Sequence, residues 1–330
     1  MFTFTRTKDK QEPIFYIGDK PVYTQFKKDD KLRIPPFRDG KQYLDGDEFR
    51  ERYNLSRNEA KELKDSLQSD IVPESKLKAK FYAVRRDLNQ RLYNEIDLRG
   101  TNKEITWKFP KDPKQWATTS LVIGSSGVGK THLVRMWIEE ALKRKKKRKF
   151  IYISPEFEVD ETLKKLRNNK RWKNYFRGID VSDKAFKEAE QGSPDDWWDQ
   201  EIFKVLDKAE EGVTVVLDDS PDAVVYKQLQ HFLIKTLRTG RHRRLAVVSL
   251  QHNIRGGKWT SQSFSSVKTV VLFPRGGGKG KIVDFMTETL GLTRRKATEL
   301  CEMFAESGRW MAINSWSPVV IYGPRLAMWV

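Results

Sequence analysis

Short apolar runs separated by amphipathic stretches organise the chain from about residue 117 onward. The runs predict buried strands at 120–123, 149–153, 213–217, 245–250 and 267–273, with a terminal pair near 309–314 and 319–322. Helical periodicity predicts helices at 130–145, 159–175, 195–211 and 224–238. Strands that alternate with helices favour an α/β fold, in which helices flank both faces of a mostly parallel sheet.

The first third of the chain follows a different pattern. Residues 1–106 are polar with scattered aromatic residues, and the stretches 47–68 and 77–98 predict amphipathic helices. The proline- and lysine-containing stretch 107–115 is typical of a linker. These features predict a smaller, mainly helical accessory or assembly domain at 1–112 and a larger domain at 113–330.

Two sets of residues are predicted to lie in the core of the larger domain. The helix 195–211 places Trp198, Ile202 and Leu206 on one stripe, which favours packing over base stacking for the neighbouring tryptophans. Cys301 lies at helical spacing from other apolar residues. As it is the single cysteine, no internal disulfide can form, and the four histidines have no metal-ligand spacing.

The charge balance points to a polyanionic partner. The 63 Lys and Arg residues exceed the 45 Asp and Glu residues, which gives a formal net charge of +18. Nucleic acid is the first candidate partner and an anionic membrane the second, while the plainer alternative is a generically basic enzyme. No apolar run approaches the length of a membrane span, so we expect none.

A glycine-rich loop carries the strongest chemical signal. The sequence Gly124-Ser125-Ser126-Gly127-Val128-Gly129-Lys130-Thr131 follows a predicted strand and opens a predicted helix. In this context the backbone N–H groups and the helix N-terminus form a nest for phosphates. Lys130 can reach the β- and γ-phosphates, and the Thr131 hydroxyl suits Mg²⁺. The loop predicts ATP and Mg²⁺ as cofactors.

Polar residues end two further predicted strands. The strand 213–217 runs into Asp218-Asp219, the pattern of a Walker B motif. We expect Asp218 to hold the Mg²⁺ shell through water, and Asp219 to orient or deprotonate the attacking water. The strand 245–250 ends in Gln251, which is either a sensor of the γ-phosphate or a turn residue.

Several basic segments have more than one interpretation. Arg241 lies in the arginine-rich segment 238–244, which could act as an arginine finger across a subunit interface, a DNA-facing patch or a solvated helix end. Lys145 and Lys146 belong to the cationic run 143–149, a candidate DNA contact, nuclear address or solvated face. Arg255 and Lys258 lie in a glycine-containing loop that suits a DNA channel or an ordinary surface.

The order of these motifs resembles the FtsK–HerA superfamily of nucleic-acid-pumping P-loop ATPases, whose fold is RecA-like. Within it, the Asp218-Asp219 pair is similar to the viral genome-packaging branch, as in poxviruses. The segment from Gly240-Arg241 to Gln251 resembles the one that ends in the family's sensor glutamine, and the last two predicted strands resemble its terminal hairpin. The resemblance covers roughly residues 117–323. It implies catalytic roles for Lys130, Asp219, Arg241 and Gln251, and a metal-holding role for Asp218.

The family also implies a function and partners. It implies a pentameric or hexameric ring that threads double-stranded DNA, with a capsid vertex or portal component as a further partner. The expected location is the interior of a host cell, at viral assembly sites in the cytoplasm or nucleus, or the virion. Open alternatives are a helicase-type pump without a capsid, a P-loop kinase, and a basic scaffold that uses ATP only to assemble.

Overall fold

The computed structural model describes residues 2–3, 13–24, 47–69, 72–73, 76–84, 95–109, 119–143, 149–190, 192–204, 213–219, 222–239, 245–254, 267–275, 278–314 and 319–329. The chain divides into two compact units. One comprises Met1–Thr106 together with Val320–Val330, and the other comprises Trp107–Val319. The larger predicted domain therefore loses its last eleven residues to the first unit, and the division falls at residue 106 instead of 112.

The larger unit is built on a mostly parallel sheet. Its strand order is β12-β11-β6-β10-β9-β7-β8, and every neighbouring pair is parallel except β11 with β12. The strands are β6 (Thr119–Ile123), β7 (Lys149–Ser154), β8 (Phe176–Asp180), β9 (Val213–Leu217), β10 (Ala246–Gln251), β11 (Thr269–Leu272) and β12 (Met311–Asn314). The order matters for function because β10 lies between β6, which precedes the glycine-rich loop, and β9, which precedes the acidic pair.

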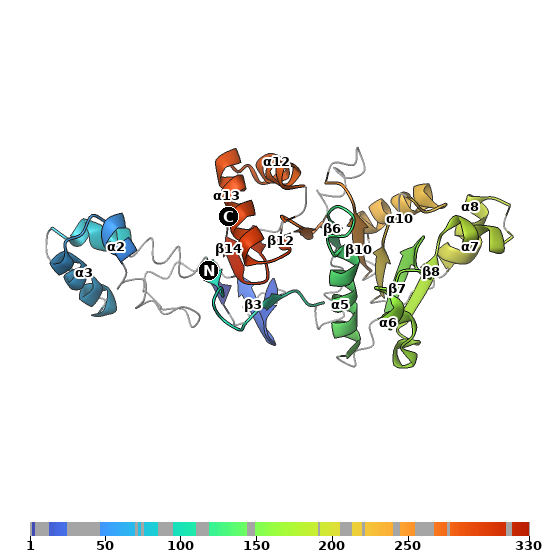
Figure 1. The fold of residues 1–330 in the computed structure, drawn as a ribbon, viewed down its shortest axis with the longest axis horizontal. Coiled ribbons are helices and arrows are strands. Elements are labelled where there is room, and N and C mark those ends of the chain that lie inside the picture. Colours follow the sequence, from blue (N-terminus) through green and yellow to red (C-terminus); the bar gives the residue numbers. More distant parts are fainter. Residues whose placement is uncertain are drawn as a thin grey trace. The chain divides into compact units, whose positions relative to one another are not determined.

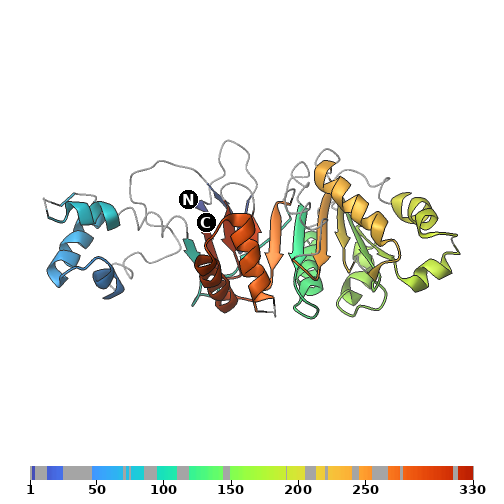
Figure 2. The same cartoon turned by 90° about the horizontal axis from the view of Figure 1, so that it is seen from above.

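Helices cover both faces of this sheet. Figures 1 and 2 show α5 (Lys130–Lys143) and α10 (Tyr226–Thr239) on opposite sides of the central strands. Connections between parallel strands are right-handed as a rule. The connections β6–α5–β7 and β9–α10–β10 run along the sheet in opposite directions, so the same hand places their helices on opposite faces. The remaining helical elements are α6 (Lys164–Arg167), η2 (Lys170–Trp172), α7 (Asp183–Glu188), α8 (Pro194–Trp197), the π-helix η3 (Trp198–Phe203), α12 (Lys279–Leu290) and α13 (Arg294–Ser307).

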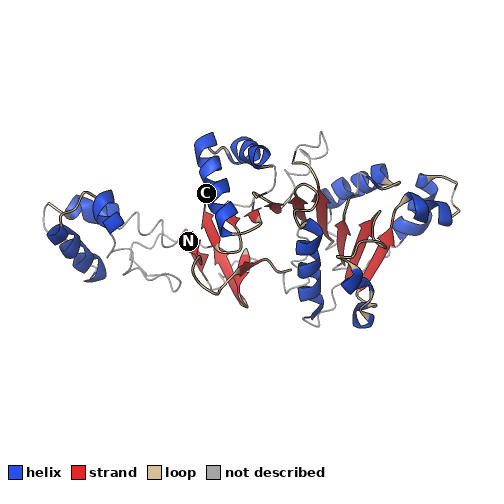
Figure 3. Cartoon of the chain, in the orientation of Figure 1, coloured by secondary structure: helices blue, strands red, loops and turns tan. Residues whose placement is uncertain are grey.

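The central strands read as apolar runs because both of their faces are covered. Every residue of β6 and β9 is buried, and Figure 3 shows helices on both sides of the strands of the larger unit. Leu229 and Leu233 of α10 belong to the same buried cluster as Val215 of β9. Trp197 and Trp198 are buried in this cluster, which confirms the prediction that they are core residues. Leu206 lies outside the described residues.

Some predicted elements of the larger unit need correction. The predicted helix 159–175 is wrong: α6 and η2 are short, and turns occupy most of the rest of this stretch. The parallel strand β8 was not predicted, nor was α12. The helical spacing around Cys301 is confirmed, since the residue is fully buried within α13.

The smaller unit contains strands as well as helices. One sheet has the order β1-β3-β2-β5, and β14 pairs antiparallel with both β13 and β4. The strands are β1 (Phe2–Thr3), β2 (Phe15–Ile17), β3 (Lys20–Thr24), β4 (Glu95–Asp97), β5 (Ile105–Thr106), β13 (Val320–Tyr322) and β14 (Leu326–Trp329). The predicted helix 77–98 is thus wrong at its end, where β4 pairs with the C-terminal strand.

A helical cluster forms another part of the smaller unit. The predicted helix 47–68 is two helices, α2 (Asp47–Arg52) and α3 (Arg57–Ser69). The break has a local cause, since Ser56 and Glu59 form a capping box that starts α3: the Ser56 N–H donates to Glu59 Oε2 at 2.8 Å. Phe49, Leu63 and Phe81 are buried together in the cluster. In the part of the chain that is described, no helix is long and apolar enough to cross a membrane.

Candidate nucleotide-binding and hydrolysis site

The glycine-rich loop joins β6 to α5, as the sequence predicts. The N–H of Gly124 donates to the carbonyl of Gln251 at 3.0 Å, which ties the start of the loop to the end of β10. Gly127 and Gly129 have φ values of +75° and +103°, which side chains with a Cβ rarely adopt. Ser125, Ser126 and Gly127 are exposed at the loop tip. Val128 follows them, and its side chain packs where a Cβ on Gly124 would collide, 2.7 Å away.

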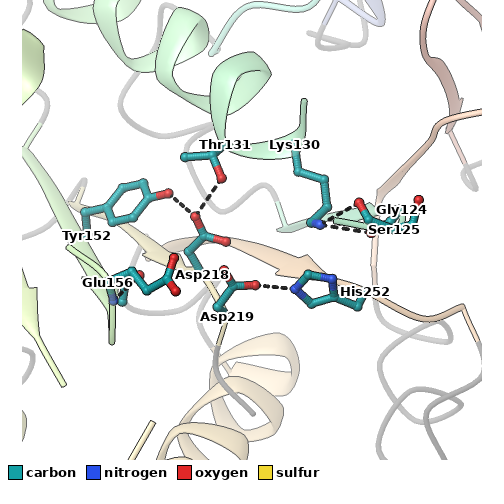
Figure 4. A network of polar contacts seen from close by, with 10 residues as sticks. Gly124, Ser125, Lys130, Thr131, Tyr152, Glu156, Asp218, Asp219 and His252 are labelled. Carbon is teal, nitrogen blue, oxygen red and sulfur yellow. Dashed lines mark hydrogen bonds and ion pairs between the residues drawn. The ribbon is translucent and has the colours of Figure 1, made fainter. Parts of the chain in front are cut away.

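Lys130 opens α5 and points back into the loop. Its Nζ donates to the carbonyl oxygens of Gly124 at 2.9 Å and Ser125 at 3.1 Å (Figure 4). Burial lowers the pKa of its ammonium group, and the carboxylates of Asp219 and Asp218 oppose that shift. A cation held inside the phosphate loop and facing two acids is positioned to meet the charge of a triphosphate.

Asp218 lies directly after β9 and is almost completely buried. The Thr131 hydroxyl donates to its Oδ2 at 3.1 Å, and the Tyr152 hydroxyl donates to the same oxygen (Figure 4). The pKa of Asp218 is raised to about 6, mainly by burial and also by the charge of Asp219, while the hydrogen bonds from Tyr152 and Thr131 and the charge of Lys130 oppose the rise. Burial and the neighbouring Asp218 hold the pKa of Tyr152 well above its usual range, so its hydroxyl stays protonated and donates.

These contacts fit a hard metal ion. Asp218 Oδ1 is buried without a hydrogen-bond partner among the described residues, next to an oxygen already bridged to Thr131. A buried carboxylate oxygen without a partner is costly unless a cation satisfies it. Threonine and carboxylate oxygens are ligands that Mg²⁺ prefers. Within the described ranges, no group of three or more His, Cys, Asp or Glu residues gathers that could hold a metal ion, so this candidate site depends on the Thr131 hydroxyl as well as on acids.

Asp219 adopts an unusual backbone conformation and contacts a histidine. Its φ is +46°, in the left-handed region, which costs energy for a residue with a side chain. His252 Nε2 and Asp219 Oδ1 lie 2.5 Å apart (Figure 4). Both side chains are partly exposed, so Asp219 faces the open side of the site while Asp218 faces inward. This geometry separates the two acids that the sequence places side by side.

Gln251 ends β10, the strand between the two motif-bearing strands. Its Cα pairs in register with Ile123, the last residue of β6, and its carbonyl receives the N–H of Gly124. Its side-chain Nε2 lies 3.4 Å from the hydroxyl of Ser249. The amide therefore lies at the carboxyl edge of the sheet beside the phosphate loop.

Two residues of the site were not predicted. Tyr152 lies on β7 and reaches Asp218 because β7 pairs with β9, with Tyr152 opposite Val216. His252 follows Gln251 and reaches Asp219 because β10 is the other neighbour of β9. A tyrosine in an apolar run and a histidine after a strand do not by themselves indicate a functional site. Their place in the site can be inferred only when the order of the strands is known. Glu156 is exposed just after β7, and Figure 4 draws it together with the residues of the site.

The structure does not describe all predicted site residues. Arg241, proposed as an arginine finger, lies outside the described residues. The same holds for the candidate DNA contacts Arg255, Lys258, Lys145 and Lys146.

Comparisons with known proteins agree with a nucleotide-binding domain. The family model "Bacterial DnaA ATPAse domain" matches residues 100–242, which include the glycine-rich loop and the acidic pair. The chromosomal replication initiator protein DnaA of Buchnera aphidicola subsp. Cinara cedri (strain Cc) is 30% identical over 104 residues. That match covers 30% of this chain and 24% of the relative, so the chain spans about a quarter of the relative's length.

The solved structures found by comparison are more distant in sequence. The DNA-packaging ATPase from Sulfolobus Turreted Icosahedral Virus is 12% identical, with a TM-score of 0.38 over 63% of this chain and 98% of that chain. The cytoplasmic domain of the Type VII secretion ATPase EccC from Thermomonospora curvata is 12% identical, with a TM-score of 0.42 over 72% of this chain and 29% of that chain. The loop, the strand order and the family match together make the larger unit an α/β domain of the P-loop ATPase type.

Proposed function

We propose that the protein is an ATP-driven translocase of double-stranded DNA, which works as a pentameric or hexameric ring and packages a viral genome into a preformed capsid. The observation that carries the ATPase part is the convergence at one sheet edge. Lys130 and Thr131 follow β6, the two acids follow β9, and Gln251 ends the strand between them. This arrangement supports the proposal that Lys130 neutralises charge, Asp218 and Thr131 hold a metal ion and Asp219 acts as a base.

The arrangement supports hydrolysis of the γ-phosphate. A water oxygen forms a bond to the γ-phosphorus, the bond from that phosphorus to the β–γ bridging oxygen breaks, and ADP and phosphate are the products. Asp219 is the more exposed acid and accepts the proton of the water. Lys130 neutralises charge on the transferred group, and Gln251 orients the water or senses the phosphate. Thr131 and Asp218 would hold Mg²⁺, which polarises the phosphate oxygens when bound.

His252 is well placed to position Asp219. A hydrogen bond to Asp219 Oδ1 fixes the carboxylate in an orientation that its left-handed backbone alone would not ensure. The second oxygen of Asp219 is then available to a water. His252 is a positioning residue in this proposal, because it acts through Asp219.

The DNA part of the proposal rests on charge. The formal net charge of +18 supports a polyanionic partner, and phosphate contacts of Lys and Arg bind duplex DNA without regard to sequence. Arg241 is proposed to complete the site of a neighbouring subunit in the ring. The capsid vertex or portal as a partner, and viral assembly sites in the host cytoplasm or nucleus or the virion as the location, follow from the same proposal.

The family match favours a second candidate. An ATPase that assembles on DNA and remodels it, without moving along it, would use the same nucleotide site. The match of residues 100–242 to a DnaA ATPase domain is the observation that favours it. Such a protein would couple ATP binding to assembly, and its hydrolysis would not scale with the length of the DNA.

A rate measurement separates these candidates. ATP turnover is measured alone, with short duplexes and with long duplexes at equal phosphate concentration, while mass photometry reports the number of subunits. A translocase predicts stimulation that grows with duplex length, together with rings. Stimulation that is independent of length favours the assembly-type ATPase, and turnover that DNA does not affect contradicts both.

A further inference from the structure

A strongly basic segment forms the later part of the connection from β7 to β8 and the start of β8, in the larger unit. Residues 162–177 contain seven Lys or Arg residues and no Asp or Glu. We call these residues the basic segment. Its cations are Lys164, Lys165, Arg167, Lys170, Arg171, Lys173 and Arg177.

The basic segment is held on a rigid base. Leu163 and Leu166 are fully buried beneath it. Arg167 is used for structure: its guanidinium donates to the carbonyls of Asp160, at 3.0 Å, and Phe157. The ring of Phe157 packs over Gly178, where a Cβ would lie 1.8 Å from the ring. The remaining cations lie on α6, on η2, in the turn after η2 and at the start of β8.

Four cations of the basic segment have no acidic partner among the described residues. Lys164 pairs with Glu161 at 3.0 Å, and Lys165 pairs with Glu139 at 3.2 Å. By contrast, Lys170, Arg171, Lys173 and Arg177 have no ion pair with a described acid, and all four are exposed.

An open hollow of about 630 Å³ lies against this surface. Its lining residues are Glu161, Lys164, Lys165, Asn168, Asn169, Lys170 and Arg171. Its lining carries four cations and one acid.

Further cations lie at the same edge of the sheet. The N–H of Phe150 donates to the carbonyl of Tyr175 at 2.7 Å, so the start of β7 adjoins the end of the basic segment. Lys149, the first residue of β7, and Lys143, the last residue of α5, are both exposed. The nucleotide site lies at the other end of β7, where Tyr152 and Ile153 meet Asp218. Lys143 and Lys149 thus lie toward the same edge as the end of the basic segment, apart from the nucleotide site.

We propose that the basic segment is a docking surface for the phosphate backbone of duplex DNA, with Lys170, Arg171 and Lys173 as the main contacts. The inference deepens the proposed function by locating a DNA contact on the larger unit. Exposed cations spread over an open surface suit a polyanion, because a site for one small phosphate ligand encloses it. A membrane surface would need an apolar face beside the cations, and Tyr175, 38% exposed, is the single large apolar residue exposed within the described basic segment.

The test compares two variants of equal charge. The test variant is Lys170→Gln, Arg171→Gln and Lys173→Gln. The matched control is Lys184→Gln, Lys227→Gln and Lys296→Gln, which removes three exposed cations elsewhere in the larger unit. Affinity for a labelled duplex of mixed sequence is measured between about 50 and 200 mM salt.

The expected result is specific to the test variant. Its binding should weaken about tenfold or more near 0.1 M salt, and the slope of log K against log salt should fall by about two to three, since each lost phosphate contact removes about 0.9. The control should bind like the wild type. Lys170→Arg with Lys173→Arg should retain binding, and ATP turnover without DNA should be unchanged in all variants.

Several results would overturn the proposal. They are wild-type binding by the test variant, an equal loss in the control, or a loss of binding to phosphatidylserine vesicles without a loss of binding to duplex DNA. The readout also separates this inference from the proposed function. If wild-type turnover is not stimulated by DNA but the test variant alone loses DNA binding, the docking surface stands and the translocase proposal fails.

Discussion

Replacing Asp218 by Asn should stabilise the protein in the absence of metal and nucleotide. Burial raises the pKa of Asp218 from 3.8 to about 6, so the folded state disfavours the charged carboxylate. A shift of about two pKa units corresponds to about 3 kcal/mol, at about 1.36 kcal/mol per unit. The variant should therefore unfold about 6–12 °C higher near neutral pH, given about 2–4 °C per kcal/mol for a domain of this size.

The sign of the pH dependence follows from the raised pKa. Below about pH 4 the carboxyl group is protonated in both the folded and the unfolded state, and the penalty vanishes. Between about pH 4 and 6 the folded state retains a proton that the unfolded state has lost, so wild-type stability falls as pH rises through this window. Above it, the wild type carries the whole penalty.

The assay is chemical or thermal unfolding in EDTA, at about pH 7.5 and again at about pH 4.5. Asp222→Asn is the matched control, because Asp222 is an exposed acid close by in the chain. The reasoning is refuted if Asp218→Asn is less stable than the wild type at the higher pH. It is also refuted if the gain in stability does not shrink on acidification.

Four further substitutions test the roles of the catalytic groups. Lys130→Ala should lower ATP turnover by about a hundredfold or more, which is about 3 kcal/mol, in a protein whose circular dichroism is unchanged; wild-type turnover would remove Lys130 from the mechanism. Asp219→Asn should slow single-turnover hydrolysis far more than it weakens nucleotide binding, and the opposite pattern would exchange the roles of the two acids. His252→Ala should slow single-turnover hydrolysis about tenfold or more, because a hydrogen bond to a charged group contributes about 1.5–3 kcal/mol. His252→Gln should restore part of the rate, and equal rates in both variants and the wild type would exclude a positioning role. Arg241→Ala should be inactive alone yet regain activity when mixed with Lys130→Ala subunits, whereas normal turnover of Arg241→Ala alone would argue against an arginine finger.

The features that sequence predicts well are local. The glycine-rich loop, the strands on either side of α5 and the two acids after β9 each follow from a few consecutive residues. The buried strands were predicted because a parallel sheet covered on both faces needs apolar runs. Trp197 and Trp198 were assigned to the core from helical spacing alone, and their burial agrees.

The features that sequence reasoning missed depend on contacts between distant residues. In the strand β8 only Phe176 is buried, so it is not an apolar run, and it contains Gly178, whose lack of a side chain makes room for Phe157. The end of the predicted helix 77–98 became β4 because it pairs with β14, more than two hundred residues later. Tyr152 and His252 join the site only through the order of β7, β9 and β10. The order of strands in the sheet cannot be predicted from the hydrophobic periodicity of the sequence or from the secondary-structure propensities of its residues.

Movement along DNA is the central claim, and displacement of a triplex-forming oligonucleotide from a duplex tests it most directly. The account predicts that the wild-type protein displaces the third strand only with Mg²⁺ and ATP, at a time that increases with the distance between the entry point and the triplex. Lys130→Ala should displace none of it. If the wild type binds DNA and hydrolyses ATP but leaves the triplex in place, the protein is not a translocase.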